Sequence, residues 1–254
     1  MLIATAQMKM SWTVEENVHA IVSAIRYVQK ERPALILFPE LAVTGFHRGI
    51  RQEVNKVHRD STVLERLCNA CNEHSVAAWI GMPRFSADEI FNTYVLISAQ
   101  GHIVAETHKL GLTKSEAILF SPGVERPISR IGGVSMATAM CREVADIEIL
   151  KSQLSSYPVE LLTWPGYVRN TEDHSIDAED GSKKQAAMLA ERLAVPIIQC
   201  NWANSLNEPN LTDIGGSSFI NEMGQVIWSC PWNKPGIGFI DLKTNTCHWD
   251  EIWF

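Results

Sequence analysis

Residues Val134 to Glu143 read VSMATAMCRE, a run of small and apolar residues that ends at a cysteine followed by an arginine and a glutamate. An apolar run without Gly or Pro is typical of a strand buried inside a sheet. We expect Cys141 at the point where this strand leaves the sheet, which is where α/β proteins usually place reactive side chains. The alternative is an ordinary buried cysteine that packs as a small hydrophobe.

The rest of the chain alternates strands with helices. Thr13 and Glu16 have the spacing of a capping box, and Pro33 ends the helix that follows. Strands at Leu2–Gln7 and Ala34–Phe38 flank this helix, as in a parallel strand–helix–strand crossover. We expect a polar loop from Glu40 to about Asp60, helices beginning near Thr62 and Ser182, and a helix from Cys141 to about Leu154. Further strands are expected at Val76–Gly81, Asn92–Ser98, His102–Glu106, Val159–Trp164, Val195–Cys200, Ser217–Ile220, Gln225–Trp228 and Gly236–Asp241.

Composition indicates an ordinary globular protein. The chain has 254 residues, of which 46% are hydrophobic and 20% charged, and its net charge is −7. No basic block longer than Lys183–Lys184 occurs, which argues against a nucleic-acid partner. No apolar stretch reaches about 18 residues, and the N-terminus lacks the pattern of a signal peptide. We expect a cytoplasmic protein with one domain over residues 1–254 and six reduced cysteines.

Three chemically useful side chains follow predicted strands. Glu40 follows ALILF and Pro39, Lys109 follows the HIVAE strand, and Cys141 follows VSMATAM. A carboxylate, an ammonium and a thiol at one edge of a sheet form a workable set for covalent catalysis. Spacing alone also allows Glu40 to be a solvated loop acid and Lys109 a surface charge.

Three motifs resemble the nitrilase superfamily of carbon–nitrogen hydrolases, in its small amidase-like branch. They are PELAVTGF (Pro39 to Phe46), THKLGLTKSEAILFSPG (Thr107 to Gly123) and the MCRE sequence around Cys141. The similarity covers nearly the whole chain, and further matches are Asn92, LLTWPGY (161–167), Cys200–Asn201 and GGSSFINEMGQV (215–226). The resemblance implies a four-layer αββα sandwich with two mixed β-sheets inside and helices outside. The strand–helix rhythm fits that fold and would also fit a doubly wound sheet.

The resemblance also implies catalytic roles. Cys141 matches the nucleophile that forms a thioester, Glu40 the general base, and Lys109 the residue that holds the oxyanion together with the Arg142 N–H. Glu116 matches a second carboxylate that positions Lys109 and the substrate, although it can also be interpreted as an acid at a helix start. One position departs from the family pattern. Ala145 stands where an Arg is common, which leaves open how the loop after Cys141 is anchored.

Candidate substrate-binding residues are less specific. Trp164, Pro165 and Tyr167 resemble the wall of the family's pocket, and ordinary core packing is the alternative reading. Phe46 ends the first motif, and Arg142 and Arg169 are candidates for holding a substrate carboxylate. The loops Phe46–Asp60 and Tyr167–Gly181 are expected to decide the substrate.

Other patterns carry less chemistry. Cys68 and Cys71 form a C-x-x-C pair on one helical face, where core packing is more plausible than a redox or zinc site. No His spacing predicts a metal site, so neither a metal nor a cofactor is expected. The aromatic tail CHWDEIWF (247–254) is expected to pack on the body or on a second subunit, and the family suggests a homodimer or higher homo-oligomer.

The sequence therefore predicts a cofactor-independent amidase that converts a small linear amide to an acid and ammonia. Rival activities are those of a nitrilase, an N-carbamoyl amine hydrolase or an acyl transferase. A catalytically inactive binding protein with the same fold and a C-x-x-C oxidoreductase are the alternatives from other classes.

Overall fold

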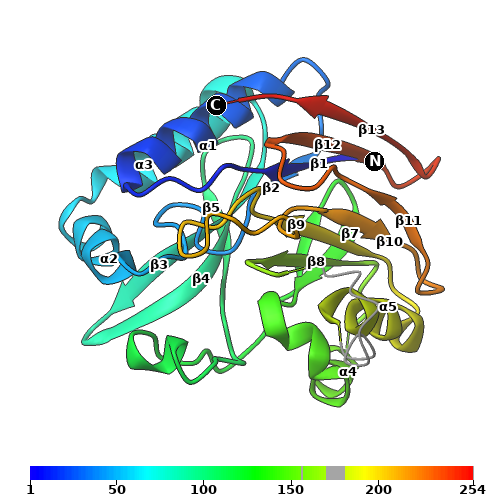
Figure 1. The fold of residues 1–254 in the computed structure, drawn as a ribbon. Helices are drawn as coiled ribbons and strands as arrows, with labels where there is room; N and C mark the ends of the chain where they lie inside the picture. The colour runs from blue at the N-terminus through cyan, green and yellow to red at the C-terminus, as the bar shows by residue number, and fades with distance from the viewer. Residues whose placement is uncertain (156, 170–180, 254) are drawn as a thin grey trace.

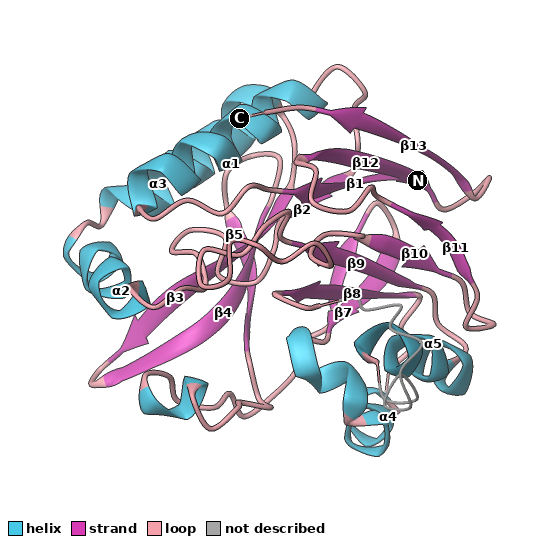
Figure 2. Cartoon of the chain, viewed as in Figure 1, coloured by secondary structure: helices cyan, strands magenta, loops and turns pink. Residues whose placement is uncertain are grey.

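Two mixed β-sheets lie face to face with helices on their outer sides, as predicted (Figures 1 and 2). The computed structural model describes residues 1–155, 157–169 and 181–253. The seven-stranded sheet has the order β13-β12-β1-β2-β3-β4-β5, and the six-stranded sheet has the order β11-β10-β9-β8-β7-β6. Parallel pairs such as β1–β2 and β7–β8 coexist with antiparallel pairs such as β1–β12 and β6–β7, which makes both sheets mixed.

The strands of the first sheet are β1 (Leu2–Gln7), β2 (Leu35–Leu37), β3 (Ala78–Ser86), β4 (Glu89–Ile97), β5 (Ile103–His108), β12 (Gly236–Asp241) and β13 (Thr246–Glu251). Those of the second are β6 (Ser129–Ile131), β7 (Val134–Thr138), β8 (Leu161–Gly166), β9 (Ile197–Asn201), β10 (Ser218–Ile220) and β11 (Val226–Ser229). The helices are α1 (Val14–Val28), α2 (Ile50–Arg59), α3 (Thr62–His74), α4 (Ile147–Leu154) and α5 (Ser182–Leu193), with short 3-10 helices η1 (Glu116–Ile118) and η2 (Cys141–Ala145).

The predicted strand–helix–strand unit at the N-terminus is confirmed. The Glu16 N–H donates to Thr13 Oγ1 at 3.3 Å, and the Thr13 hydroxyl donates back to Glu16 Oε2 at 2.7 Å, which forms the capping box at the start of α1. The chain then returns through β2, which pairs in parallel with β1. This crossover brings the end of β2, and with it Glu40, to the middle of the sheet.

Most of the buried apolar side chains fall into three layers. The α1 and α3 helices pack on the outer face of the first sheet, where Ile25 and Leu67 are fully buried. Trp79 and Ile198 belong to the layer between the sheets. A third layer joins the second sheet to α4 and α5 through residues such as Leu189. The two inner faces of the sheets are therefore held at a fixed separation, and side chains at their edges can meet.

Cys68 and Cys71 contribute to the first of these layers, as the core-packing interpretation predicted. Both thiols are free, and Cys71 is fully buried. Burial raises the pKa of the Cys71 thiol to about 12. A redox dithiol needs a lowered thiol pKa, so this pair lacks the character of one.

The expectation of a polar loop up to Asp60 is wrong, because residues 50–59 form α2. This helix buries Val54 and Val57, which have helical spacing, but seven of its ten residues are polar or charged, so the segment as a whole reads as a polar loop. Gly49 stands at its N-cap and makes no side-chain capping bond, so the usual start signal is missing as well. The helix expected directly after Cys141 also differs, since the chain first makes the 3-10 turn η2 before α4 begins.

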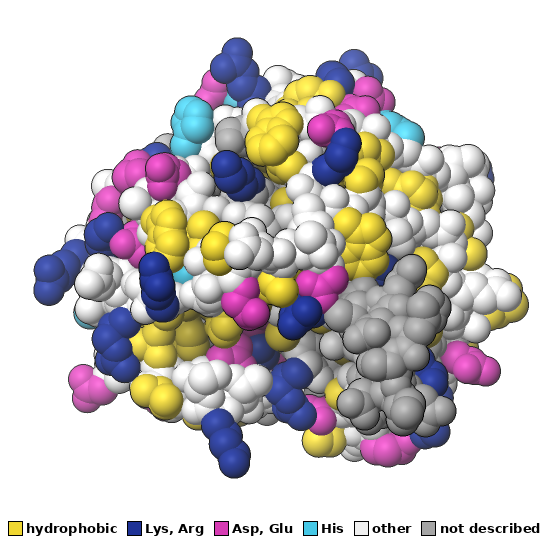
Figure 3. Space-filling view, in the orientation of Figure 1, with side chains coloured by type: hydrophobic (Ala, Val, Ile, Leu, Met, Phe, Trp, Pro, Cys, Tyr) yellow, Lys and Arg dark blue, Asp and Glu magenta, His cyan; other side chains and the backbone are white. Residues whose placement is uncertain are grey.

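The aromatic tail packs on the body as far as Glu251, one of the two expected outcomes, and Phe254 lies outside the described residues. Thr246–Glu251 form β13, the edge strand beside β12, and His248 stacks on Phe239 with ring centroids 4.6 Å apart. Trp253 beyond it is 66% exposed, and Lys9 Nζ lies 5.7 Å from its ring centroid. On the face shown in Figure 3, basic and acidic side chains are interspersed. In the described part of the chain, every helix is too short or too polar to cross a lipid bilayer.

Candidate active site

Three strand ends from both sheets deliver the predicted catalytic side chains. Glu40 lies three residues beyond β2, and Lys109 follows β5 directly. Cys141 lies three residues beyond β7 and begins η2. Glu116 comes from η1, in the loop that follows Lys109. The first two strands belong to one sheet and β7 to the other, so the site spans the seam between the sheets.

Lys109 connects the two carboxylates. Its Nζ donates to Glu40 Oε1 at 2.7 Å and to Glu116 Oε1 at 2.6 Å. The lysine side chain is fully buried, and Glu40 and Glu116 are nearly so. The Asn92 amide donates to Glu40 Oε1 at 2.7 Å, and the Thr113 N–H donates to Glu116 Oε2 at 2.8 Å. Lys109 and Glu116 are therefore not surface charges, and Glu40 is not a solvated loop acid.

The electrostatics of this cluster favour a charged lysine. Burial alone would lower the pKa of Lys109, but the charges of Glu40, Cys141 and Glu116 outweigh it and raise that pKa above its usual value. Burial raises the pKa of the Glu40 carboxyl, as does the charge of Glu116, while the Lys109 ammonium and the Asn92 amide oppose the shift. Glu40 is thus a carboxylate with increased basicity, a property suited to a general base.

Cys141 occupies a strained position next to these charges. Its φ angle is +50°, in the left-handed region that residues other than Gly rarely adopt. The Trp164 indole donates to the Cys141 main-chain oxygen at 2.9 Å, and the thiol sulfur lies 3.9 Å from the Tyr167 carbonyl oxygen. Burial and the Glu40 charge raise the pKa of the thiol to about 12, against the lowering effect of Lys109. The thiol is therefore protonated at neutral pH and needs a base to become nucleophilic.

The main chain around Glu40 packs closely against β3 at Gly81. A Cβ atom added to Gly81 would lie 2.3 Å from the Leu41 nitrogen and 2.4 Å from the Pro39 oxygen. The Trp202 indole donates to the Glu40 main-chain oxygen at 3.1 Å. The close approach of β3 at Gly81 therefore requires a glycine, and it fixes where the Glu40 side chain begins.

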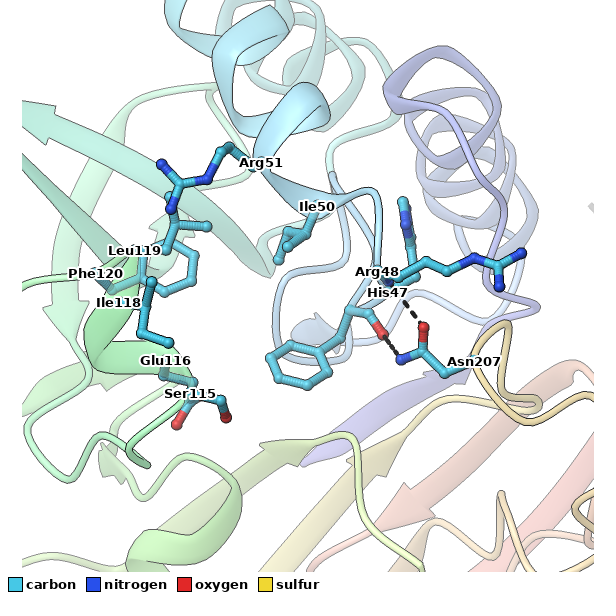
Figure 4. A pocket seen from close by; sticks show the side chains of 11 residues that line it. His47, Arg48, Ile50, Arg51, Ser115, Glu116, Ile118, Leu119, Phe120 and Asn207 are labelled. Atoms are coloured by element: carbon cyan, nitrogen blue, oxygen red, sulfur yellow. Dashed lines mark hydrogen bonds between the residues drawn. The ribbon is translucent and has the colours of Figure 1, made fainter.

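A cavity of about 430 Å³ opens beside this cluster (Figure 4). Its lining includes Glu116 together with the apolar side chains of Phe46, Ile50 and Ile118. Arg48 and Arg51 stand on opposite sides of it in Figure 4. Phe46 also packs against Tyr167, with ring centroids 5.5 Å apart. Of the four predicted catalytic residues, Glu116 lines this cavity, whereas Glu40, Lys109 and Cys141 do not.

The predicted substrate-binding residues divide into two groups. Phe46 lines the cavity. Tyr167 is not among the lining residues, but it packs against Phe46 and its hydroxyl donates to Ser205 Oγ at 2.5 Å. Trp164 and Pro165 are buried in β8. The Trp164 ring packs in the core with α5, and its indole N–H binds the Cys141 main-chain oxygen. The core-packing reading therefore describes the Trp164 ring, which does not line the cavity.

The two arginines considered for a substrate carboxylate already have acidic partners. Arg142 forms an ion pair with Asp146 at 3.0 Å, and Arg169 forms one with Asp213 at 2.8 Å. Most of the second predicted specificity loop, residues 170–180, lies outside the described residues.

Asn92 and Glu143 are site residues to which the sequence analysis assigned no role. Asn92 faces Glu40 because β4 pairs with β3, which is next to β2. Glu143 accepts hydrogen bonds from the loop after Lys109 and from the residue before Cys141. The available signals were the positions of both residues in the family-like segments. Within the described residues, the side chains of His, Cys, Asp and Glu form no group suited to a metal ion.

Comparison with known proteins decides the family. The model of the carbon–nitrogen hydrolase family matches residues 2–248. The chain belongs to the carbon–nitrogen hydrolase family. Among curated relatives of this hydrolase, an aliphatic nitrilase of Rhodococcus rhodochrous is 22% identical over 219 residues, which cover 76% of this chain and 58% of the relative. An (R)-stereoselective amidase of Pseudomonas sp. is 29% identical over 112 residues, which cover 43% and 40%. The chain thus spans about half the length of the curated relatives it matches.

Solved structures confirm the fold of the carbon–nitrogen hydrolase described above. The NitN amidase from Nesterenkonia sp. AN1 superposes with a TM-score of 0.80 at 20% identity, covering 95% of this chain and 92% of that one. A cysteine-to-alanine mutant of the same amidase in complex with butyramide gives a TM-score of 0.81 at 19% identity, covering 96% and 92%. Both share the αββα sandwich.

Proposed function

We propose that this carbon–nitrogen hydrolase is an amidase that converts a small linear amide to a carboxylic acid and ammonia through a thioester on Cys141. The observation that carries the proposal is the position of Lys109, which bridges Glu40 and Glu116 at 2.7 and 2.6 Å beside a thiol whose pKa responds to all three charges. A base, a fixed cation and a nucleophile are the parts that acyl transfer through a thiol requires.

Acylation begins with a neutral thiol. Glu40 takes the thiol proton while the sulfur forms a bond to the amide carbon, and the carbonyl oxygen becomes an oxyanion. The Lys109 ammonium and the Arg142 N–H stabilise that oxyanion, and Glu116 holds the ammonium in place. Glu40 then gives its proton to the amide nitrogen, and the C–N bond breaks. Ammonia departs, and the acyl group stays on Cys141 as a thioester.

Deacylation uses the same base. Glu40 accepts a proton from a water molecule whose oxygen attacks the thioester carbon, and Lys109 again stabilises the oxyanion. The C–S bond breaks, the proton held by Glu40 returns to the sulfur, and the carboxylic acid departs. No cofactor is required at either stage.

The cavity supports a small substrate with an apolar chain. Phe46, Ile50 and Ile118 provide its apolar lining, and its volume of about 430 Å³ suits a compact molecule. The butyramide bound by a structurally similar amidase is a molecule of this class.

An ammonia-release assay over short-chain aliphatic amides tests the proposal. The wild type is expected to release ammonia, and Cys141→Ala is expected to release none. Cys247→Ala is the matched control, because Cys247 is another free and partly exposed thiol that lies in β13. Turnover that survives Cys141→Ala would exclude the thioester route.

Product analysis separates the rival activities. A nitrilase would consume the nitrile faster than the corresponding amide, and an N-carbamoyl amine hydrolase would release carbon dioxide with the ammonia. A catalytically inactive relative would show neither product, and an acylating reagent would label Cys141 only after unfolding.

We also propose a cytoplasmic homodimer or higher homo-oligomer. Ile149 on α4 is 57% exposed and Met188 on α5 is 40% exposed, so the outer side of the second sheet offers apolar surface for a second copy. Light scattering coupled to size-exclusion chromatography measures the oligomeric state directly, and a monomer would contradict this proposal.

A further inference from the structure

Glu143 is a buried carboxylate that joins the two loops of the proposed catalytic centre. It lies in η2, two residues after Cys141, and its side chain is 2% exposed. The partners of its oxygens are main-chain N–H groups of neighbouring segments and a guanidinium, so it is not itself part of the Glu40–Lys109–Cys141 set.

The two oxygens of Glu143 bind different segments. Oε1 accepts the N–H groups of Leu110 and Gly111 at 2.8 and 2.9 Å, immediately after Lys109. Oε2 accepts the Met140 N–H at 2.7 Å, immediately before Cys141. One side chain therefore holds the residue after the lysine and the residue before the cysteine.

Arg126 neutralises this carboxylate. Its Nη1 lies 3.1 Å from Glu143 Oε2 and also donates to the Thr138 carbonyl, while its Nε donates to Gln153 of α4 at 3.1 Å. Burial opposes ionisation of Glu143, but the guanidinium and the main-chain donors outweigh it and lower the pKa of the carboxyl. Glu143 is therefore charged at neutral pH, and all of its hydrogen bonds are charge-assisted.

The sequence left open how the loop after Cys141 is anchored, because Ala145 stands where an Arg is common in the family. The contacts of Glu143 identify the anchor. The anchoring guanidinium comes from Arg126, which precedes β7, and not from the loop itself. Acyl transfer depends on the separation between the Lys109 ammonium and the oxygen of the carbonyl group that Cys141 attacks, because oxyanion donors act only at hydrogen-bond distance.

We propose that Glu143, held by Arg126, is a positioning residue that sets the distance between Lys109 and Cys141 for oxyanion stabilisation. The inference rests on the proposed amidase function. It goes beyond that function because Glu143 touches neither the substrate nor the reacting atoms.

Glu143→Gln tests the inference with almost no change in shape. The amide oxygen can still accept from the Leu110 and Gly111 N–H groups. Its NH2 group, a donor, then faces the Met140 N–H and the Arg126 guanidinium, which are donors too, so both of those hydrogen bonds are lost. We expect the two loops to separate. A displacement of about 1 Å lowers the rate of acyl transfer by about 100-fold.

Two reactions of the same thiol distinguish positioning from a general loss of structure. Acylation by p-nitrophenyl butyrate passes through an oxyanion, whereas alkylation by iodoacetamide displaces iodide without one. Glu143→Gln should slow acylation by about 100-fold and change the alkylation rate by less than about threefold, since thiolate formation by Glu40 is retained. Gly111→Ala is a milder second variant. Its Cβ would lie 3.1 Å from Glu143 Cγ, which is buried and held, and 3.1 and 3.2 Å from Arg142 Nη1 and Asp146 Oδ2, which are the ends of flexible side chains. It should show a several-fold loss with the same selectivity for acylation.

Glu148→Gln on α4 is the matched control, since Glu148 is an exposed carboxylate that forms an ion pair with Arg192 on the surface, and it should leave both rates unchanged. Equal losses in acylation and alkylation, or wild-type acylation in Glu143→Gln, would overturn the inference. Ammonia release by the wild type tests the amidase proposal separately, so an active wild type with a fully active Glu143→Gln variant would reject only the positioning role.

Discussion

Trp164 donates its indole N–H to the main-chain oxygen of Cys141 at 2.9 Å, and Cys141 holds a φ angle of +50°. A non-glycine residue in this region costs about 1–3 kcal/mol, so the surrounding structure must stabilise it. The fully buried tryptophan supplies one such contact from the adjacent strand β8.

We predict that Trp164→Phe lowers kcat by about 10-fold and the free energy of unfolding by about 1–3 kcal/mol, because it leaves the Cys141 carbonyl without its partner. Trp79→Phe is the control. Trp79 is equally buried in the layer between the sheets, and its indole donates to the Tyr94 main-chain oxygen at 3.4 Å. Steady-state kinetics and urea denaturation of both variants should show similar losses of stability, with a loss of kcat only for Trp164→Phe. A kcat loss of equal size in both would contradict the prediction.

The pH dependence should reveal the environment of Glu40. Its pKa is raised by burial, so kcat/KM should rise with pH along an acid limb whose midpoint lies above the ordinary glutamate value. The Asn92 amide favours the ionised carboxylate. Asn92→Ala should therefore raise the pKa of Glu40 further and move the acid limb to higher pH. An acid limb that stays in place or moves to lower pH would show that another group controls it.

The strand pattern placed Glu40, Lys109 and Cys141 beyond strand ends, and the resemblance to the carbon–nitrogen hydrolases was needed to predict that they share one site. Each follows a short apolar segment, and strand ends converge wherever sheets pack face to face. The resemblance to the carbon–nitrogen hydrolases added Glu116, whose contact with Lys109 depends on the path of a loop. The sandwich itself also came from the resemblance, since the same rhythm fits a doubly wound sheet.

The strand and helix pattern could not predict the roles of Glu143 and Asn92, because most of their partners lie far from them in sequence and meet them only in the folded chain. Glu143 binds main-chain groups of two loops and Arg126, and none of these contacts has a sequence period. The sequence of α2 resembles a polar loop because most of its residues are polar or charged and no capping residue marks its start, although Val54 and Val57 have helical spacing. Trp164 illustrates the opposite problem, since an aromatic residue at a strand end fits both a pocket wall and a core position.

Replacement of the buried cation should destabilise the protein in a pH-dependent manner. Lys109→Met leaves Glu40 and Glu116 buried without a counter-charge, at a cost of about 3–5 kcal/mol at pH 8. Without Lys109 the folded-state pKa of Glu40 rises further above its unfolded value, so the folded state binds more protons than the unfolded state. Stability then falls as pH rises above the unfolded pKa, and the loss should be smaller at pH 5 than at pH 8. Urea denaturation at both pH values measures this difference, and an equal loss at the two would contradict it.

Gly81 offers a test of how precisely Glu40, the proposed base, must be placed. A Cβ at this position would lie 2.8 Å from the Glu40 carbonyl carbon and closer still to the flanking Leu41 and Pro39 atoms, all of them main chain. Because main-chain atoms cannot rotate away as a side chain can, Gly81→Ala must push the Glu40 segment off β3. We predict a loss of kcat of about 100-fold. Gly133→Ala is the control, since a Cβ there meets nothing within 4 Å and only strains a turn with φ +86°. Both variants should lose stability in thermal unfolding, but only Gly81→Ala should lose activity. Full activity in Gly81→Ala would mean that Glu40 tolerates displacement and is not the base.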